Sequence, residues 1–160
     1  VDLPVSQTRR ERIKIDKLAL EIKEELLNKH PERELEFKIQ PWVTILSDRR
    51  MIQLVIYQLF CSAMDFIPAA RKGRVELGMY HRGEQKVLFV RNNGTGFTEA
   101  QAKRLFDAFR DSSQDETLPK DTTRLACAQR VIHRLGGQIW AEGAEGAGGS
   151  IYFTYHKTKS

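Results

Sequence analysis

The chain has 160 residues, 41% of them hydrophobic and 29% charged, which suits one domain with a substantial core. No stretch approaches the roughly 20 apolar residues of a membrane-spanning helix. Residues 1–12 are polar and basic, so no signal peptide is expected, and Val1 in place of Met predicts a cut fragment. The net charge of +5 comes from scattered basic residues, so we expect a solvated surface and no nucleic-acid partner.

A short lead segment, an edge strand and a helix are predicted first. Residues 1–12 are expected to be a linker or the end of a truncated helix, and residues 13–15 an edge strand. Asp16 is a suitable N-cap for a helix from residue 17 to about 29, and Pro31 stops that helix. One helix face carries apolar residues four positions apart, namely Leu18, Ile22 and Leu26.

A second unit of strands and a helix follows. Residues 34–39 alternate apolar and charged side chains, which predicts a half-buried strand. Residues 43–46 predict the next strand. Asp48 is placed to cap a long helix that ends near residue 66.

The second half of the chain predicts two pairs of strands with a helix between them. Gly136 and Gly137 are expected to form the C-cap of that helix. The expected strands cover residues 74–80, 86–91, 138–142 and 149–155, the expected turn residues 82–84, and the expected helix residues 122–135. Helices that alternate with strand pairs predict an α/β fold, a two-layer α/β sandwich with a mixed sheet and helices on one face.

The cysteines, tryptophans and histidines are expected to have structural roles. Cys61 and Cys127 lie in apolar helical stretches, which predicts buried, reduced thiols in a cytosolic protein. Trp42 and Trp140 are expected in the core or at a sheet edge. The four histidines do not have the spacing of metal ligands. His133 is expected to lie on the surface or to contribute to packing, and not to be a phosphoacceptor.

The strand predicted near residue 90 runs into Asn92-Asn93-Gly94-Thr95-Gly96, and an amphipathic stretch, 99–109, follows. Two closely spaced glycines between a strand and a helix permit a ligand to approach the backbone. A tight turn explains the same residues, because Asn-Gly is a strong turn signal. The polar, aperiodic stretch 110–121 predicts a mobile loop.

Four segments point to one family. Residues 58–66 read Gln-Leu-Phe-Cys-Ser-Ala-Met-Asp-Phe, 92–96 read Asn-Asn-Gly-Thr-Gly, 105–109 read Leu-Phe-Asp-Ala-Phe, and 133–143 read His-Arg-Leu-Gly-Gly-Gln-Ile-Trp-Ala-Glu-Gly. In this order they resemble the Asn-rich box, first glycine box, phenylalanine box and ending of the ATP-binding domain of sensor histidine kinases. That domain shares the Bergerat-type fold with gyrase, Hsp90 and MutL. The resemblance covers about residues 15–155 and is closest to bacterial sensory-box and phytochrome-type kinases.

Several polar positions depart from the family pattern. The magnesium-ligating Asn of the family falls at Ser62, which becomes the candidate magnesium ligand here. The Lys that faces the phosphates falls at Asp65, where an anion repels them. The Asp that accepts a hydrogen bond from the adenine amine falls at Asn92, whose oxygen still accepts one without charge assistance.

The second glycine box of the family is replaced as well. Its place is held by residues 120–126, Lys-Asp-Thr-Thr-Arg-Leu-Ala, whose bulk resists the conformations that glycine allows. Lys120 and Arg124 still supply positive charge, and Tyr57, Gln58 and Arg124 are candidates to fill the pocket. The resemblance thus implies a degenerate nucleotide pocket of Gln58, Ser62, Asp65, Asn92, Gly94, Gly96, Phe97, Thr122, Thr123 and Arg124, with no assigned catalytic residue.

The family implies ATP and magnesium as cofactors, and the replacements weaken their binding here. We predict a pseudokinase domain of a two-component sensor kinase that acts by protein binding. Its expected partners are the helical hairpin upstream in the same or another kinase and the receiver domain of a response regulator. The alternatives are a functional domain that phosphorylates a histidine on that hairpin, and a pocket retuned for another ligand.

The predicted organisation is a lead segment over 1–12, the kinase-like domain over 13–156 and a tail over 157–160. A cytoplasmic location without direct membrane insertion is expected, and membrane tethering of the whole protein is left open. The family's phosphoacceptor histidine lies in the hairpin, so the fragment alone is not expected to autophosphorylate.

Overall fold

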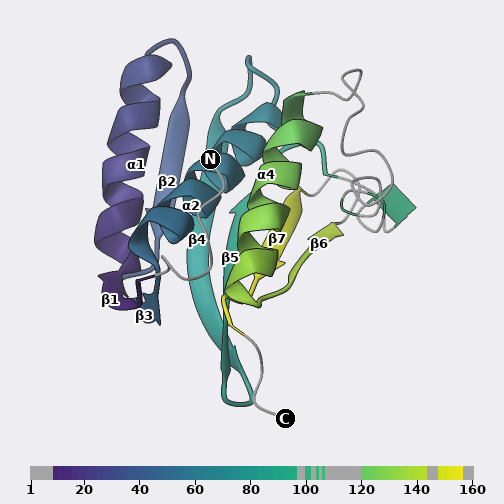
Figure 1. Cartoon of the computed structure of the whole chain (residues 1–160). Coiled ribbons are helices and arrows are strands. Elements are labelled where there is room, and N and C mark those ends of the chain that lie inside the picture. Colours follow the sequence, from purple (N-terminus) through teal and green to yellow (C-terminus); the bar gives the residue numbers. More distant parts are fainter. Residues whose placement is uncertain are drawn as a thin grey trace.

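The computed structural model describes residues 9–96, 100, 101, 104, 106, 120–143 and 148–156, with the backbone alone at 120–123. Helices of the described part of the chain lie on one face of a sheet (Figure 1). The elements are β1 (Glu11–Lys14), α1 (Ile15–Lys29), β2 (Leu35–Ile39), β3 (Thr44–Ser47), α2 (Arg49–Asp65), β4 (Gly73–Arg82), β5 (Gln85–Asn92), α4 (Lys120–Leu135), β6 (Ile139–Gly143) and β7 (Gly149–Phe153).

The main sheet has five strands in the order β2-β4-β5-β7-β6. β2 runs parallel to β4 and the other neighbours are antiparallel, so the predicted mixed sheet is confirmed. β4 and β5 form a hairpin whose turn contains Gly83 with a φ of 64°, as two-residue hairpin turns require. β1 and β3 pair separately as a small antiparallel ribbon.

α1 begins without the predicted cap. Its N-cap residue is Lys14, which makes no side-chain capping bond, and Asp16 lies inside the first turn, so the Asp16 prediction is wrong. The Ile15 amide donates instead to the Val43 carbonyl at 2.8 Å, because the ribbon brings the chain past this helix end. The predicted apolar face is confirmed, since Leu18, Ile22 and Leu26 are buried.

Asp48 is the N-cap of α2, as predicted. Asp48 Oδ1 accepts a hydrogen bond from the Met51 amide at 3.1 Å, and Oδ2 accepts one from the Arg9 amide at 2.9 Å. The side chain is buried, so the cap also fixes the entering chain to the start of α2.

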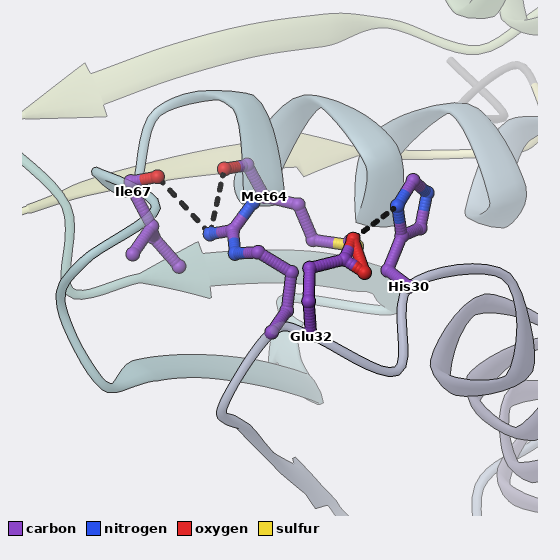
Figure 2. A network of polar contacts seen from close by, with 5 residues as sticks. His30, Glu32, Met64 and Ile67 are labelled. Atoms are coloured by element: carbon purple, nitrogen blue, oxygen red, sulfur yellow. Dashed lines mark hydrogen bonds and ion pairs between the residues drawn. The ribbon is translucent and has the colours of Figure 1, made fainter.

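Arg33 binds two carbonyl groups at the C-terminal end of α2. Figure 2 shows the residues that carry these carbonyls, Met64 and Ile67. Arg33 Nη2 lies 3.1 Å from the Ile67 carbonyl and 3.5 Å from the Met64 carbonyl. The last carbonyls of a helix have no partner within the helix and carry partial negative charge, which a guanidinium complements. In the same loop His30 Nδ1 lies 3.5 Å from Glu32 Oε1.

α4 begins at Lys120, so the predicted loop over 110–121 ends earlier than expected and its other residues lie outside those described. Gly136 has a φ of 87°, and the Gly137 amide donates to the Ile132 carbonyl at 2.9 Å. These features confirm the predicted glycine C-cap. Cys61 is buried as predicted, whereas Cys127 is only half-buried.

Aromatic side chains gather on the sheet face opposite the helices. Trp140 stacks on Tyr152 with ring centroids 5.6 Å apart, and Tyr152 lies 6.1 Å from Phe89. Trp140 lies on the edge strand β6, as predicted. Trp42 is 91% exposed with a φ of 64°, so the expectation of a core or sheet-edge position is wrong.

Among the described residues, no helix has the length and apolar character needed to cross a membrane.

We expect Asp48→Ala to lower the free energy of unfolding by about 1–2 kcal/mol, because it removes a helix cap. Asp16→Ala is the matched control. It should cost less than about 1 kcal/mol, since Asp16 interacts only with the partial charge of the helix end. Urea denaturation of both variants measures the difference, and a larger loss for Asp16→Ala would contradict the assignment of the caps.

Candidate functional site

The candidate site lies where β5 ends against the C-terminal end of α2. The Thr95 amide donates to the Phe66 carbonyl at 3.2 Å. A Cβ atom on Gly94 would lie only 2.2 Å from that carbonyl oxygen. A side chain at position 94 would therefore force the loop away from the helix, and glycine fixes their close approach.

Asn92 is the last residue of β5 and is 7% exposed. It pairs with Val75 of β4 on one side and with Gly149 of β7 on the other. Its Oδ1 accepts a hydrogen bond from the Gly94 amide at 2.8 Å. This bond fixes the side-chain orientation, because the reversed amide would place two donors face to face.

Asn93 has a different, structural role. Its Oδ1 accepts from the Arg74 amide at 2.7 Å, and its Nδ2 donates to the Lys72 carbonyl at 3.2 Å. Both polar ends are therefore used to join the loop to the start of β4.

Gly148 also limits the space around Asn92, and the sequence analysis did not single it out. It has a φ of 91°, and a Cβ there would lie 2.1 Å from the Asn92 carbonyl oxygen. The glycine-rich turn before β7 was the available signal. Thus the turn residue Gly148 packs against the same strand end as Gly94.

α2 contributes two polar atoms without partners. Ser62 is fully buried and its Oγ has no hydrogen-bond partner, and the same holds for the buried Oε1 of Gln58, within the described part of the chain. The two residues are one helical turn apart and share a face. An unsatisfied buried polar atom costs roughly 1–3 kcal/mol, so these two atoms are a source of instability on this face of α2.

Asp65 and Arg124 join α2 to α4 through an ion pair. Arg124 Nε lies 3.1 Å from Asp65 Oδ2, and the side chains are 33% and 39% exposed, respectively. The sequence analysis treated Asp65 as a repelling anion and Arg124 as an available cation. In the structure each charge neutralises the other.

Cys61 lies near this pair and beside Tyr57. The Tyr57 hydroxyl accepts from Lys29 Nζ of α1 at 3.0 Å, which raises the pKa of Lys29. This contact directs Tyr57 toward α1, contrary to the prediction that it fills the pocket. Burial raises the pKa of the Cys61 thiol, and the Arg124 charge opposes that shift only in part.

Of the remaining predicted residues, some are described by the structure and others are not. Gly96 follows the loop with a φ of 76°. The side chains of Thr122 and Thr123 and all of Phe97 lie outside the described residues. Of the phenylalanine box, Phe106 is described and packs into the core.

The donor set fits magnesium poorly. Magnesium prefers carboxylate and phosphate oxygens in octahedral geometry. At this site Ser62 offers one neutral oxygen, and the Asp65 carboxylate is paired with Arg124. No group of three or more His, Cys, Asp or Glu residues that could hold a metal occurs where the chain is described.

The layered architecture and the strand-end site define an α/β domain of the ATPase type. Residues 47–159 match the family model described as histidine kinase-, DNA gyrase B-, and HSP90-like ATPase. The chain belongs to this family, as its motifs indicated.

Curated relatives are sensor kinases. The chain is 32% identical over 135 residues to the adaptive-response sensory kinase SasA of Synechococcus sp. strain JA-3-3Ab, covering 82% of this chain and 35% of that protein. It is 27% identical to the sensor histidine kinase WalK of Bacillus subtilis, covering 81% of this chain and 20% of that protein. The chain thus spans about a third or less of these relatives.

Solved structures confirm the predicted fold. The nucleotide-free catalytic domain of histidine kinase ThkA has a TM-score of 0.72 at 18% identity, covering 95% of this chain and 99% of that domain. Full-length ShkA in complex with AMPPNP has a TM-score of 0.73 at 21% identity, covering 96% of this chain and 33% of that protein. At these identities the likeness concerns the fold alone.

Gly94→Ala is expected to destabilise the domain by about 3 kcal/mol, because the new methyl group meets backbone that cannot move aside. Gly83→Ala is the control. No atom lies within 4 Å of the added Cβ at Gly83, so only its left-handed backbone is strained, at about 1 kcal/mol. Denaturant titrations compare the two, and equal losses would show that the contact with Phe66 is unimportant.

The Asp65–Arg124 pair should have a coupling free energy of about 0.2–1 kcal/mol that decreases with added salt, because both groups are partly exposed. A double-mutant cycle with Asp65→Asn and Arg124→Gln measures it. The Glu21–Arg49 pair, at 3.7 Å, is a suitable comparison. A zero coupling at low salt would contradict a stabilising contact between α2 and α4.

Proposed function

We propose that the chain is the ATPase-like domain of a two-component sensor histidine kinase, in a pseudokinase form that acts by protein binding. The observation that carries this proposal is the ion pair between Asp65 and Arg124, 3.1 Å apart. The family resemblance places a phosphate-facing lysine at residue 65 and a glycine at residue 124. An internal ion pair therefore occupies two positions that serve the triphosphate in the family.

Charge accounts for the expected loss of ATP binding. A triphosphate needs free cations and bare helix amides to offset its negative charge. Arg124 would have to leave Asp65 to meet a phosphate, and the freed carboxylate would then repel the same anion. Net charge from this pair is zero, whereas a lysine at residue 65 would supply one positive charge.

The poor fit of the described side chains to magnesium acts in the same direction. Magnesium bound to a nucleotide normally offsets part of the phosphate charge and is held by carboxylate oxygens. The hydroxyl of Ser62 is one neutral oxygen, and its position inside the core leaves it no freedom to approach a distant ion.

Partners of two kinds fit such a scaffold: a helical hairpin upstream in the same or another kinase, and the receiver domain of a response regulator. The curated relatives are sensor kinases of which the chain matches a part. Another supporting finding is the structure of ThkA in complex with the response regulator protein TrrA, with a TM-score of 0.71 at 19% identity. Cytoplasmic action is proposed with these partners.

A functional ATP-binding domain is the second candidate. It is favoured by the close contacts of Gly94 with Phe66 and of Asn92 with Gly94, since these contacts join the end of β5 to the end of α2. In that case the chain would phosphorylate a histidine on the upstream hairpin.

Calorimetric titration with an ATP analogue and magnesium tests the choice. The parent chain is expected to give no binding heat at micromolar nucleotide. A variant with Ser62→Asn, Asp65→Lys, Asn92→Asp, Thr122→Gly and Arg124→Gly should bind, because it restores the family's charges and glycines. Asp65→Asn is the control, which removes the carboxylate without adding a cation.

Micromolar, magnesium-dependent binding by the parent would overturn the pseudokinase proposal and favour the second candidate. Failure of the folded, restored variant to bind better than the parent would contradict the account of how the site was lost.

A further inference from the structure

The small ribbon of β1 and β3 has one buried and one exposed face. Ile13 and Ile45 lie opposite each other in the ribbon, and both are buried in the core. The next pair, Arg12 and Leu46, is exposed, because successive side chains of a strand point to opposite faces. Lys14 follows in the same phase as Arg12 and is exposed as well.

Trp42 extends this exposed face beyond the end of β3. The alternation of side chains continues there, since Val43 is 2% exposed and Trp42 is 91% exposed. The Ile15 amide donates to the Val43 carbonyl at 2.8 Å, so the two chain segments remain in contact up to the residue next to Trp42. The exposed set, which we call the ribbon face, consists of Arg12, Lys14, Trp42, Thr44 and Leu46.

Trp42 occupies a backbone position that normally holds a smaller residue. Pro41 and Trp42 form a turn in which Trp42 has a φ of 64°. The position after proline in a turn of positive φ favours Gly or Asn, because other side chains strain the backbone there. Tryptophan gains no burial in return, since the residue is almost fully exposed. Neither turn preference nor core packing therefore accounts for an indole at this point of the chain.

Positive charge dominates the ribbon face. Arg12 and Lys14 are its ionisable residues, and within the described part of the chain neither forms an ion pair. Glu11 alternates onto the other face of β1, and Asp16 lies half-buried in the first turn of α1. The ribbon face thus presents two cations beside two exposed apolar side chains, and the surface that complements it is anionic.

A lipid surface fits this face better than a protein pocket does. Aromatic anchors of protein interfaces are packed among neighbours that exclude water, whereas Trp42 has almost no packed neighbours. Indole rings accumulate at the boundary between lipid headgroups and acyl chains, and lysine and arginine are attracted to anionic headgroups. A bilayer accepts a protruding indole without a matching pocket.

We propose that the ribbon face docks the domain on an anionic lipid membrane. Trp42 and Leu46 enter the interface, while Arg12 and Lys14 meet the lipid phosphates. The contact is peripheral and involves no membrane-spanning helix. It is independent of the proposed function, since the ribbon face shares no residue with the candidate site.

Vesicles of defined composition test this docking on the whole chain. Vesicles with equal parts of phosphatidylglycerol and phosphatidylcholine should bind at least about 10-fold more tightly than vesicles of phosphatidylcholine alone, because each cation near an anionic surface contributes about 5-fold. Cosedimentation measures both affinities. Trp140→Phe leaves Trp42 as the one tryptophan, and its fluorescence should move to shorter wavelength when anionic vesicles are added.

Paired charge variants separate the ribbon face from the overall charge of the chain. Arg12→Gln with Lys14→Gln should weaken binding to anionic vesicles about 10-fold or more. Arg130→Gln with Lys72→Gln removes the same two charges at exposed positions outside the ribbon and should weaken it much less. Trp42→Ala should also weaken binding, and circular dichroism verifies that all variants are folded.

Equal losses in the two double variants would overturn the proposal, since the attraction would then reflect only the net charge of +5. Unchanged Trp42 fluorescence in the bound state would overturn it too. Absence of binding to either kind of vesicle would overturn it and make an acidic protein surface the next occupant to test. None of these results bears on the pseudokinase proposal, which depends on nucleotide binding.

Discussion

The arrangement of the site depends on the approach of two backbones, the end of β5 and the end of α2. Glycine at residue 94 permits it, because a Cβ there would lie 2.2 Å from the Phe66 carbonyl oxygen. The loop amide of Thr95 then satisfies that carbonyl, and Arg33 satisfies the Ile67 and Met64 carbonyls beside it. Three carbonyls at the helix end are therefore paired within the chain, and the end of α2 is joined to the loop after β5.

Local sequence patterns were sufficient to predict most of the helices and strands. Period-two alternation located β2, and side-chain or glycine caps located the start of α2 and the end of α4. The start of α1 was missed because the partner of its Ile15 amide is Val43, far along the chain, and no local pattern shows such a contact. The prediction for Trp42 was wrong because tryptophan is usually buried, whereas the turn that contains Trp42 directs its side chain into solvent.

The candidate site was less predictable than the fold. The motifs identified the correct part of α2 and the loop after β5. The pairing of Asp65 with Arg124, 59 positions apart, could not be predicted from the sequence. Each residue was compared only with the phosphate-binding residue that the family has at the same position. Likewise, the residue type of Asn92 did not reveal which end of its amide is used internally. Only the bond to Gly94 resolves that question.

Two positions of the candidate site differ from the family pattern in physically different ways. The charges of Asp65 and Arg124 cancel each other, so neither group meets another ion without breaking the pair. At Asn92 the shape of a carboxylate is kept, while one acceptor becomes a donor. A charge pair is screened by salt and a buried hydrogen-bond pattern is not. The two changes therefore respond to different conditions, because added salt weakens the partly exposed ion pair and leaves the buried hydrogen bond in place.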